Sequence, residues 1–152
     1  MQYKKMGRTG LKISEITLGT MIFGQQVDEA EALKIMDLAF EKGINSFDTA
    51  DGYAGGRSEE IVGKALKNKR HAVVLASKVY SKQGPGPNDS GLSREHILQA
   101  IENSLRRLGT DYLDIYYAHI PDNTTPIEET LRAFDYLVKQ GKVRRTQSTR
   151  TL

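Results

Sequence analysis

The sequence predicts an α/β fold in which short parallel strands alternate with helices. Two observations predict it. Short apolar runs alternate four times with longer segments whose apolar residues recur at helical spacing. Each apolar run also ends in a polar residue or a glycine that leads into a loop. Because this alternation is typical of βα units joined into a parallel sheet, we expect four consecutive βα units.

The first unit is expected to comprise a strand at residues 16–19 and a helix over 28–42. Asp28 and Glu31 resemble a capping box, and Gly43 stands where a helix ends in a left-handed residue. The second unit combines a strand at 45–48 with a helix opened by Ser58. Acidic residues follow Ser58 directly, near the positive end of the helix dipole.

The third strand, residues 72–78, is nearly all apolar, as expected for a parallel strand covered on both faces. Ser93 opens the next helix and Gly109 ends it. The fourth strand, residues 112–118, leads to a helix that begins at Thr-Pro-Ile-Glu, residues 125–128, and ends before Gly141. That tetrapeptide combines a capping box with proline at the first helical position.

Residues 3–6 and 12–14 flank the turn Gly-Arg-Thr-Gly and predict a small β-hairpin that caps the sheet. The 152-residue length is that of one ordinary domain. Four βα units fit half of a (β/α)8 barrel, and they fit part of an open doubly wound sheet equally well. The hydrophobic periodicity does not choose between these two architectures.

In either architecture, function collects at the carboxyl ends of the strands. Asp48, Lys78 and His119 fall at three successive strand ends, and Tyr53 lies on the loop after Asp48. Each of these residues taken alone has an ordinary structural explanation, such as a turn cap, a solvated lysine or a packed aromatic ring. Their joint position at one edge favours a shared site.

The motifs around these residues resemble those of the aldo-keto reductase family. They occur in that family's order and comprise Leu-Gly-Thr-Met at 18–21, Asn-Ser-Phe-Asp-Thr-Ala-Asp-Gly-Tyr at 45–53, Arg-Ser-Glu at 57–59, Ala-Ser-Lys at 76–78, Leu-Gly-Thr-Asp-Tyr-Leu-Asp at 108–114, and His119. The match runs from about residue 3 to residue 144 and covers the N-terminal half of the family's chain. The resemblance implies a TIM (β/α)8 barrel, here an N-terminal half barrel.

The resemblance also implies a catalytic tetrad of Asp48, Tyr53, Lys78 and His119 and the reduction of an aldehyde or ketone by hydride transfer. A free tyrosine has a pKa of about 10, and a nearby ammonium lowers that value. By resemblance, Tyr53 is the general acid, Lys78 tunes it, Asp48 holds Lys78, and His119 orients the carbonyl.

NADPH is the cofactor that the resemblance implies, with contacts from Gly19, Thr20, Met21 and Asp48. No Gly-x-Gly-x-x-Gly fingerprint follows the first strand, which agrees with a family that binds its cofactor across a barrel mouth. No metal is expected, because the three histidines form no His-x-His pair and cysteine is absent. A Schiff-base role for Lys78 is chemically possible, but it leaves Tyr53 without a function.

Charge and composition restrict the partners. The net charge is +3, but five of the 22 basic residues lie from Lys139 onward without any acidic residue, which leaves 17 basic against 19 acidic residues before it. The body is therefore not a basic nucleic-acid surface. No apolar run is long enough to span a membrane. Together with the absence of cysteine, this predicts a cytoplasmic protein.

The length sets a limit on the function. A complete barrel needs about 250 residues, and only four units are expected here. We expect residues 1–144 to form the partial barrel domain and residues 145–152 to form a divergent basic tail without a strand. A half barrel is expected to self-associate or to take a partner chain that covers it. The alternative to an enzyme is a truncated, catalytically inactive relative, or an interaction module that cannot bind cofactor alone.

Overall fold

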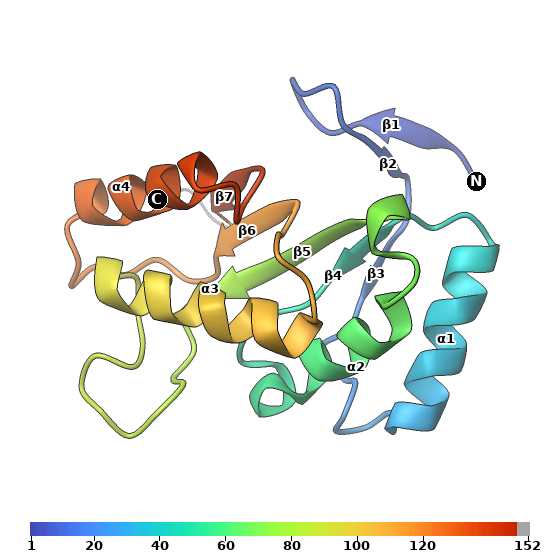
Figure 1. Cartoon of the computed structure of the whole chain (residues 1–152), viewed down its shortest axis with the longest axis horizontal. Helices are drawn as coiled ribbons and strands as arrows, with labels where there is room; N and C mark the ends of the chain where they lie inside the picture. Colours follow the sequence, from blue (N-terminus) through green and yellow to red (C-terminus); the bar gives the residue numbers. More distant parts are fainter. Residues whose placement is uncertain (149–152) are drawn as a thin grey trace.

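The computed structural model describes residues 1–148 and confirms the predicted alternation of strands and helices (Figure 1). The elements are β1 (Tyr3–Lys5), β2 (Lys12–Ser14), β3 (Thr17–Gly19), α1 (Glu29–Glu41), β4 (Ser46–Asp48), η1 (Tyr53–Gly56), α2 (Arg57–Leu66), η2 (Arg70–Ala72), β5 (Val74–Val79), α3 (Arg94–Leu108), β6 (Ile115–Ala118), α4 (Ile127–Lys139) and β7 (Thr146–Ser148). β1 and β2 form the predicted antiparallel hairpin. The main sheet is parallel throughout, in the order β3-β4-β5-β6-β7.

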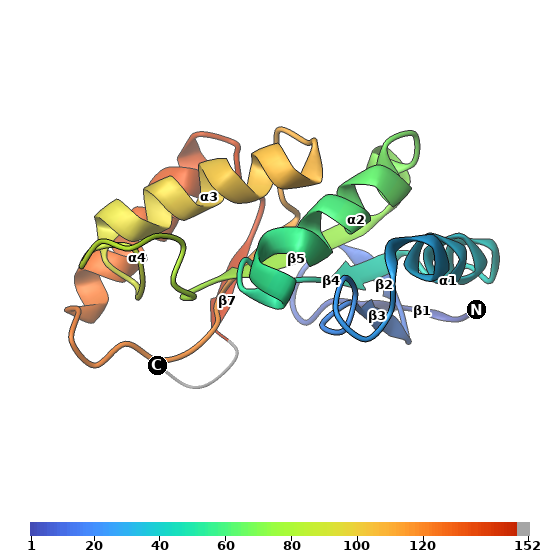
Figure 2. The same cartoon turned by 90° about the horizontal axis from the view of Figure 1, so that it is seen from below.

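The four α-helices lie on one face of the main sheet, as the second view shows (Figure 2). A doubly wound sheet carries helices on both faces, whereas a (β/α)8 barrel carries them on the outer face alone. Within residues 1–148 the arrangement is therefore that of half a barrel. The choice that periodicity left open is decided by the placement of the helices.

The main core lies between the sheet and the helices. Strand side chains meet helix side chains there, and the fully buried ones include Phe47, Leu75, Tyr116, Ile61, Ile97, Ile101 and Leu137. A second, smaller core lies on the opposite face of the sheet. Met6, Leu11 and Ile13 of the hairpin region pack there against the starts of β5 and β6. The hairpin thus caps the sheet as predicted, on the face that the helices leave open.

Several predicted helix ends are confirmed. The Asp28 carboxylate accepts a hydrogen bond from the amide of Glu31 at 2.9 Å, and the Ser93 hydroxyl accepts one from the amide of His96 at 3.2 Å. α3 ends at Gly109, whose φ of 62° lies in the left-handed region that glycine adopts without a Cβ penalty.

Two predicted caps are wrong. α2 begins one residue before Ser58, directly after the 3-10 turn η1, and the Ser58 hydroxyl is buried and bonded to Thr20 and Thr49 instead. At α4, the hydroxyl of Thr125 donates to Asp122 at 2.9 Å rather than capping the helix, and Pro126 occupies the cap position. In both places, a tertiary partner takes the hydroxyl that the local pattern assigned to the helix end.

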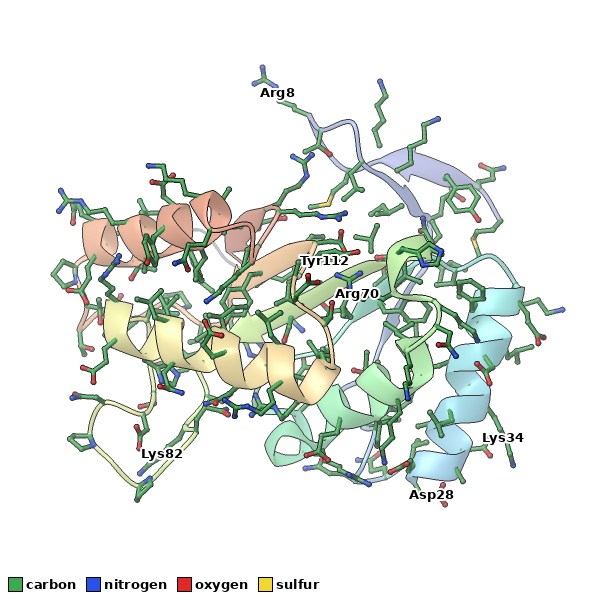
Figure 3. The ribbon with its side chains drawn as sticks, viewed as in Figure 1. Arg8, Asp28, Lys34, Arg70, Lys82 and Tyr112 are labelled. Carbon is green, nitrogen blue, oxygen red and sulfur yellow. The ribbon has the colours of Figure 1, made fainter. Side chains whose placement is uncertain are left out.

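A buried carboxylate fixes the start of β6. Asp114 is 2% exposed and forms ion pairs with Arg70 at 2.9 Å and Arg144 at 3.1 Å. The guanidinium carbons of both arginines lie over the Tyr112 ring, 3.9 Å and 4.0 Å from its centroid. Figure 3 shows Arg70 and Tyr112 side by side. This arrangement joins the segment after α4 to the sheet.

The sheet continues beyond residue 144, so the expectation of a tail without a strand is wrong for part of it. β7 pairs in parallel with β6, with Tyr116 opposite Thr146 and Tyr117 opposite Gln147. Backbone pairing with an edge strand does not require apolar side chains, and for this reason the polar tail gave no strand signal. Residues 149–152 of the predicted tail lie outside the described residues. Every helix between residues 1 and 148 is too short or too polar to cross a bilayer.

Candidate active site

The register of the sheet brings the predicted tetrad to one edge. Asp48 pairs with Ala76 two residues before Lys78, and Lys78 pairs with Tyr117 two residues before His119. Backbone hydrogen bonds continue beyond the strands, because the amide of His119 donates to the carbonyl of Val79 at 3.0 Å. The parallel strands therefore present these side chains at their carboxyl ends, where barrel sites form.

Lys78 is the centre of the site. Its side chain is 8% exposed, and its ammonium donates to Asp48 Oδ1 at 2.5 Å, to the carbonyl of Thr49 at 2.8 Å and to the hydroxyl of Tyr53 at 3.0 Å. An ammonium has three donors and no acceptor. All three donors are thus satisfied, which a buried charge requires.

The contact with Lys78 determines the direction of the Tyr53 hydroxyl. Because Lys78 can only donate, the Tyr53 oxygen is the acceptor of this bond, and its own proton is available to another acceptor. The His119 ring meets the Tyr53 ring edge to face, with centroids 5.8 Å apart and planes at 78°. The structure therefore brings all four predicted residues together.

The charges of this cluster act on its neighbours. Burial lowers the pKa of His119 below its usual 6.5, and the Lys78 ammonium lowers it further, while Asp48 partly offsets both. A neutral imidazole is therefore favoured at neutral pH. Burial, with a contribution from the Asp48 carboxylate, raises the pKa of Tyr117 above 10.0. The pKa of His119 responds to both Lys78 and Asp48, in agreement with one shared site.

The residues predicted for cofactor binding differ in how exposed their side chains are. Gly19 is exposed, with nothing within 4 Å of the place where a Cβ would stand, and Met21 is 61% exposed. A flat ring can therefore approach the end of β3 closely beside Asp48, whose side chain is 28% exposed. The side chain of Thr20, in contrast, is buried, and its hydroxyl bonds the Asp48 carbonyl and Ser58. The open space at Gly19 and the exposed Met21 and Asp48 side chains fit a planar cofactor at this edge, and the side chain of Thr20 does not take part.

A second polar cluster lies behind the site and was missed by the sequence analysis. Glu59 is completely buried and accepts hydrogen bonds from the Ser77 hydroxyl at 2.6 Å and from Arg107 Nε at 2.7 Å. A signal existed in the sequence. Glu59 precedes Val62 and Leu66 at helical spacing, so a carboxylate falls on the buried face of its helix. A charged residue on an apolar helix face needs a partner of opposite charge, and this requirement predicts a buried ion pair here without naming Arg107 as the partner.

Asp51 belongs to the same buried region. Its carboxylate accepts a hydrogen bond from the amide of Tyr80 at 3.3 Å, and burial raises its pKa from 3.8 to about 6. The charge of Glu59 raises it as well, while hydrogen bonds from Tyr80 and Ser81 oppose the shift.

As for metals, residues 1–148 contain no group of three or more histidine or acidic side chains arranged to hold an ion.

Comparison with known proteins decides the family. The model of the Aldo/keto reductase family matches residues 15–150. The chain belongs to the aldo-keto reductase family. A solved structure, the aldo-keto reductase AKR11C1 from Bacillus halodurans in its holo form, superposes with a TM-score of 0.88 and 40% sequence identity. That superposition covers 99% of this chain and 51% of the other, so the shared fold is half of an aldo-keto reductase barrel.

Two similar relatives carry a different description. A probable voltage-gated potassium channel subunit beta of Arabidopsis thaliana is 46% identical over 145 residues, and one of Oryza sativa subsp. japonica is 45% identical over the same length. Each alignment covers 93% of this chain and 44% of the relative. The chain thus spans less than half the length of these relatives.

Proposed function

We propose that this chain carries the proton-donating site of an NADPH-dependent reductase that converts an aldehyde or ketone to an alcohol. One observation carries the proposal. The Tyr53 hydroxyl accepts a hydrogen bond from the Lys78 ammonium at 3.0 Å, so its own proton can be given to a substrate oxygen. The same ammonium is held by Asp48.

This geometry supports one role for each of the four residues. Negative charge develops on the carbonyl oxygen during reduction, and a positioned acid that supplies a proton lowers the barrier. Tyr53 is this acid. Lys78 stabilises the phenolate that remains, and its bonds to Asp48 and Thr49 fix the ammonium in place. His119 has a pKa lowered by burial and by Lys78, so it is a neutral group. It can donate a hydrogen bond to the substrate carbonyl without replacing Tyr53 as the acid.

A nicotinamide cofactor would supply the hydride when bound. Gly19, Met21 and Asp48 would hold its ring at the end of β3, because this edge is open and lies beside Tyr53 and Lys78. The holo form of the similar Bacillus halodurans reductase supports a bound cofactor in this family. Thr20 would support this edge from within the core, since its hydroxyl, its amide and its carbonyl are all bonded to other residues.

The decisive test is Tyr53→Phe. The ring and its edge contact with His119 remain, and only the proton donor is lost. We expect carbonyl-dependent oxidation of NADPH to fall by about 10²- to 10⁴-fold. Tyr136→Phe is the matched control, because Tyr136 is exposed on α4. Wild-type turnover that survives unchanged in Tyr53→Phe would show that the proton has another source.

A second candidate function is that of an interaction module without turnover. The two plant relatives described as channel β subunits favour it. On this alternative, the half barrel binds another protein or a second copy of itself on the sheet face that the helices leave open (Figure 2). Absence of carbonyl-dependent NADPH oxidation, together with sedimentation as a dimer or larger species, would favour this function over the first.

A further inference from the structure

The backbone that follows Tyr53 is strained. Ala54 has φ 52° and ψ 35°, and Gly55 and Gly56 follow with φ of 62° and 95°. Three consecutive residues therefore adopt left-handed conformations. For a residue with a Cβ, such as Ala54, this costs roughly 1–2 kcal/mol. Strain of this kind persists only where surrounding contacts determine the conformation.

Arg107 of α3 contacts the C-terminal end of this turn. A Cβ placed on Gly56 would lie 2.9 Å from Cδ and 3.0 Å from Nε of Arg107. At Gly55, in contrast, a Cβ would meet nothing within 4 Å. The arginine side chain thus lies directly against the bare backbone of Gly56, and this contact requires a residue without a side chain there.

Glu59 fixes the position of that arginine. Its carboxylate is completely buried, and one oxygen accepts from Arg107 Nε at 2.7 Å. The other oxygen accepts from the Ser77 hydroxyl at 2.6 Å. Ser77 directly precedes Lys78 on β5 and is fully buried. The ion pair therefore connects the turn after Tyr53 to the strand that carries Lys78.

A second branch reaches the N-terminal end of the same segment. Arg107 Nη1 donates to Gln83 Oε1 at 3.2 Å, and Gln83 Nε2 donates to the carbonyl of Asp51 at 3.2 Å. Asp51 is tied to β5 as well, because its amide donates to the carbonyl of Lys78 at 3.2 Å. Asp51 and Gly56 flank Tyr53, and Arg107 supports both of them.

We propose that Arg107 is the positioning residue of Tyr53: its guanidinium holds both ends of the turn and so keeps the hydroxyl beside the Lys78 ammonium. The side chain of Arg107 donates hydrogen bonds to Glu59, Gln83 and Ser104, so it acts on Tyr53 through the residues on either side of the turn. The contribution of Arg107 to catalysis rests on the proposed function, but its effect on the position of the Tyr53 side chain does not. These two claims can therefore be measured separately.

The test compares Arg107→Lys with Arg106→Lys. Lysine keeps the charge beside Glu59 but cannot also reach Gln83 in the guanidinium geometry. Arg106 is the matched control, because it is exposed on the same helix and its side chain donates a hydrogen bond to Asn103. The readout is the ¹³C NMR signal of the Tyr53 ring in protein labelled at tyrosine Cζ, assigned by its loss in Tyr53→Phe.

We expect Arg107→Lys to shift and broaden the Tyr53 signal, while the signals of the exposed residues Tyr3 and Tyr136 stay in place. Arg106→Lys should leave all three signals unchanged. In turnover with NADPH and a carbonyl substrate, kcat should fall between tenfold and a hundredfold with KM little changed, because a displaced acid slows the chemical step. An unmoved Tyr53 signal in Arg107→Lys overturns the proposal, and so does an equal shift of all tyrosine signals.

Two further outcomes also decide between the claims. If circular dichroism shows that Arg107→Lys is unfolded, Gln83→Ala replaces it, because that variant cuts only the branch to Asp51. The proposal then requires the Tyr53 signal to move in Gln83→Ala, and an unmoved signal overturns it. If the wild-type chain shows no NADPH oxidation, the proposed function fails, while the NMR comparison still measures the positioning of Tyr53.

Discussion

Asp51→Asn should make the protein more stable at neutral pH. Asp51 is completely buried beside the turn that carries Tyr53, and burial raises the pKa of its carboxyl from 3.8 to about 6. The folded state therefore binds the proton more tightly than the unfolded state does. Folding stability contributed by this group is intact below pH 3.8, falls as the pH rises from 3.8 to 6, and stays low above that range.

The magnitude follows from the shift. Each pKa unit corresponds to about 1.4 kcal/mol, so the ionised carboxylate reduces the free energy of unfolding by about 3 kcal/mol at pH 7. Asparagine removes the charge and keeps an oxygen that can accept the amide of Tyr80. The free energy of unfolding should therefore rise by nearly this amount in Asp51→Asn. The rise is reduced by the free energy lost where asparagine bonds Ser81 less well than the carboxylate does.

The assay is urea unfolding followed by circular dichroism from pH 4 to pH 7.5, in wild type, Asp51→Asn and Asp135→Asn. Asp135 is an exposed control, with a surface ion pair to Lys139 that contributes little. We expect the stability difference between Asp51→Asn and wild type to be near zero at pH 4 and to grow to about 3 kcal/mol at pH 7.5. A difference that does not depend on pH would refute the burial argument.

Three further predictions concern other sites. Asp114→Asn should lower the free energy of unfolding by about 3 kcal/mol, since two arginines lose their buried counter-charge. Urea unfolding checks this against the exposed Asp111→Asn. Gly63→Ala should destabilise by about 1–3 kcal/mol, because its Cβ would lie 2.6 Å from the carbonyl oxygen of Leu108. Gly10→Ala, with open space around it, is the control, and equal melting temperatures in the two variants would refute this contact. His119 should titrate below pH 6.5 in a proton NMR titration, and stability from this group should be lost as the pH falls through its lowered pKa. A midpoint above 6.5 would contradict the effect of burial and Lys78.

The sequence predicted the order of the elements well, because the helix and strand periods are strong local signals. It also predicted that Asp48, Tyr53, Lys78 and His119 lie near one another, because parallel strands deliver their carboxyl ends to one edge. It failed where a tertiary partner competes with a local signal, as at Ser58 and Thr125. It also failed at β7, whose pairing with β6 depends on backbone groups that leave no side-chain pattern.

The hydrogen bonds that support Tyr53 show why a supporting network is harder to predict from sequence than the candidate site that it holds. Asp48 and Lys78 lie on strands that neighbour each other in the sheet, and Tyr53 follows Asp48 by five residues, so topology brings Tyr53 to the same edge as Lys78. Arg107, in contrast, lies 48 residues from Glu59 in the sequence, and their contact depends on how α2 and α3 rotate against each other. Sequence periodicity indicates which face of a helix is buried, but it does not indicate which buried side chain meets which. The position of the turn that carries Tyr53 therefore depends on helix packing, and substitutions between α2 and α3 should affect the candidate site even where they touch none of its four residues.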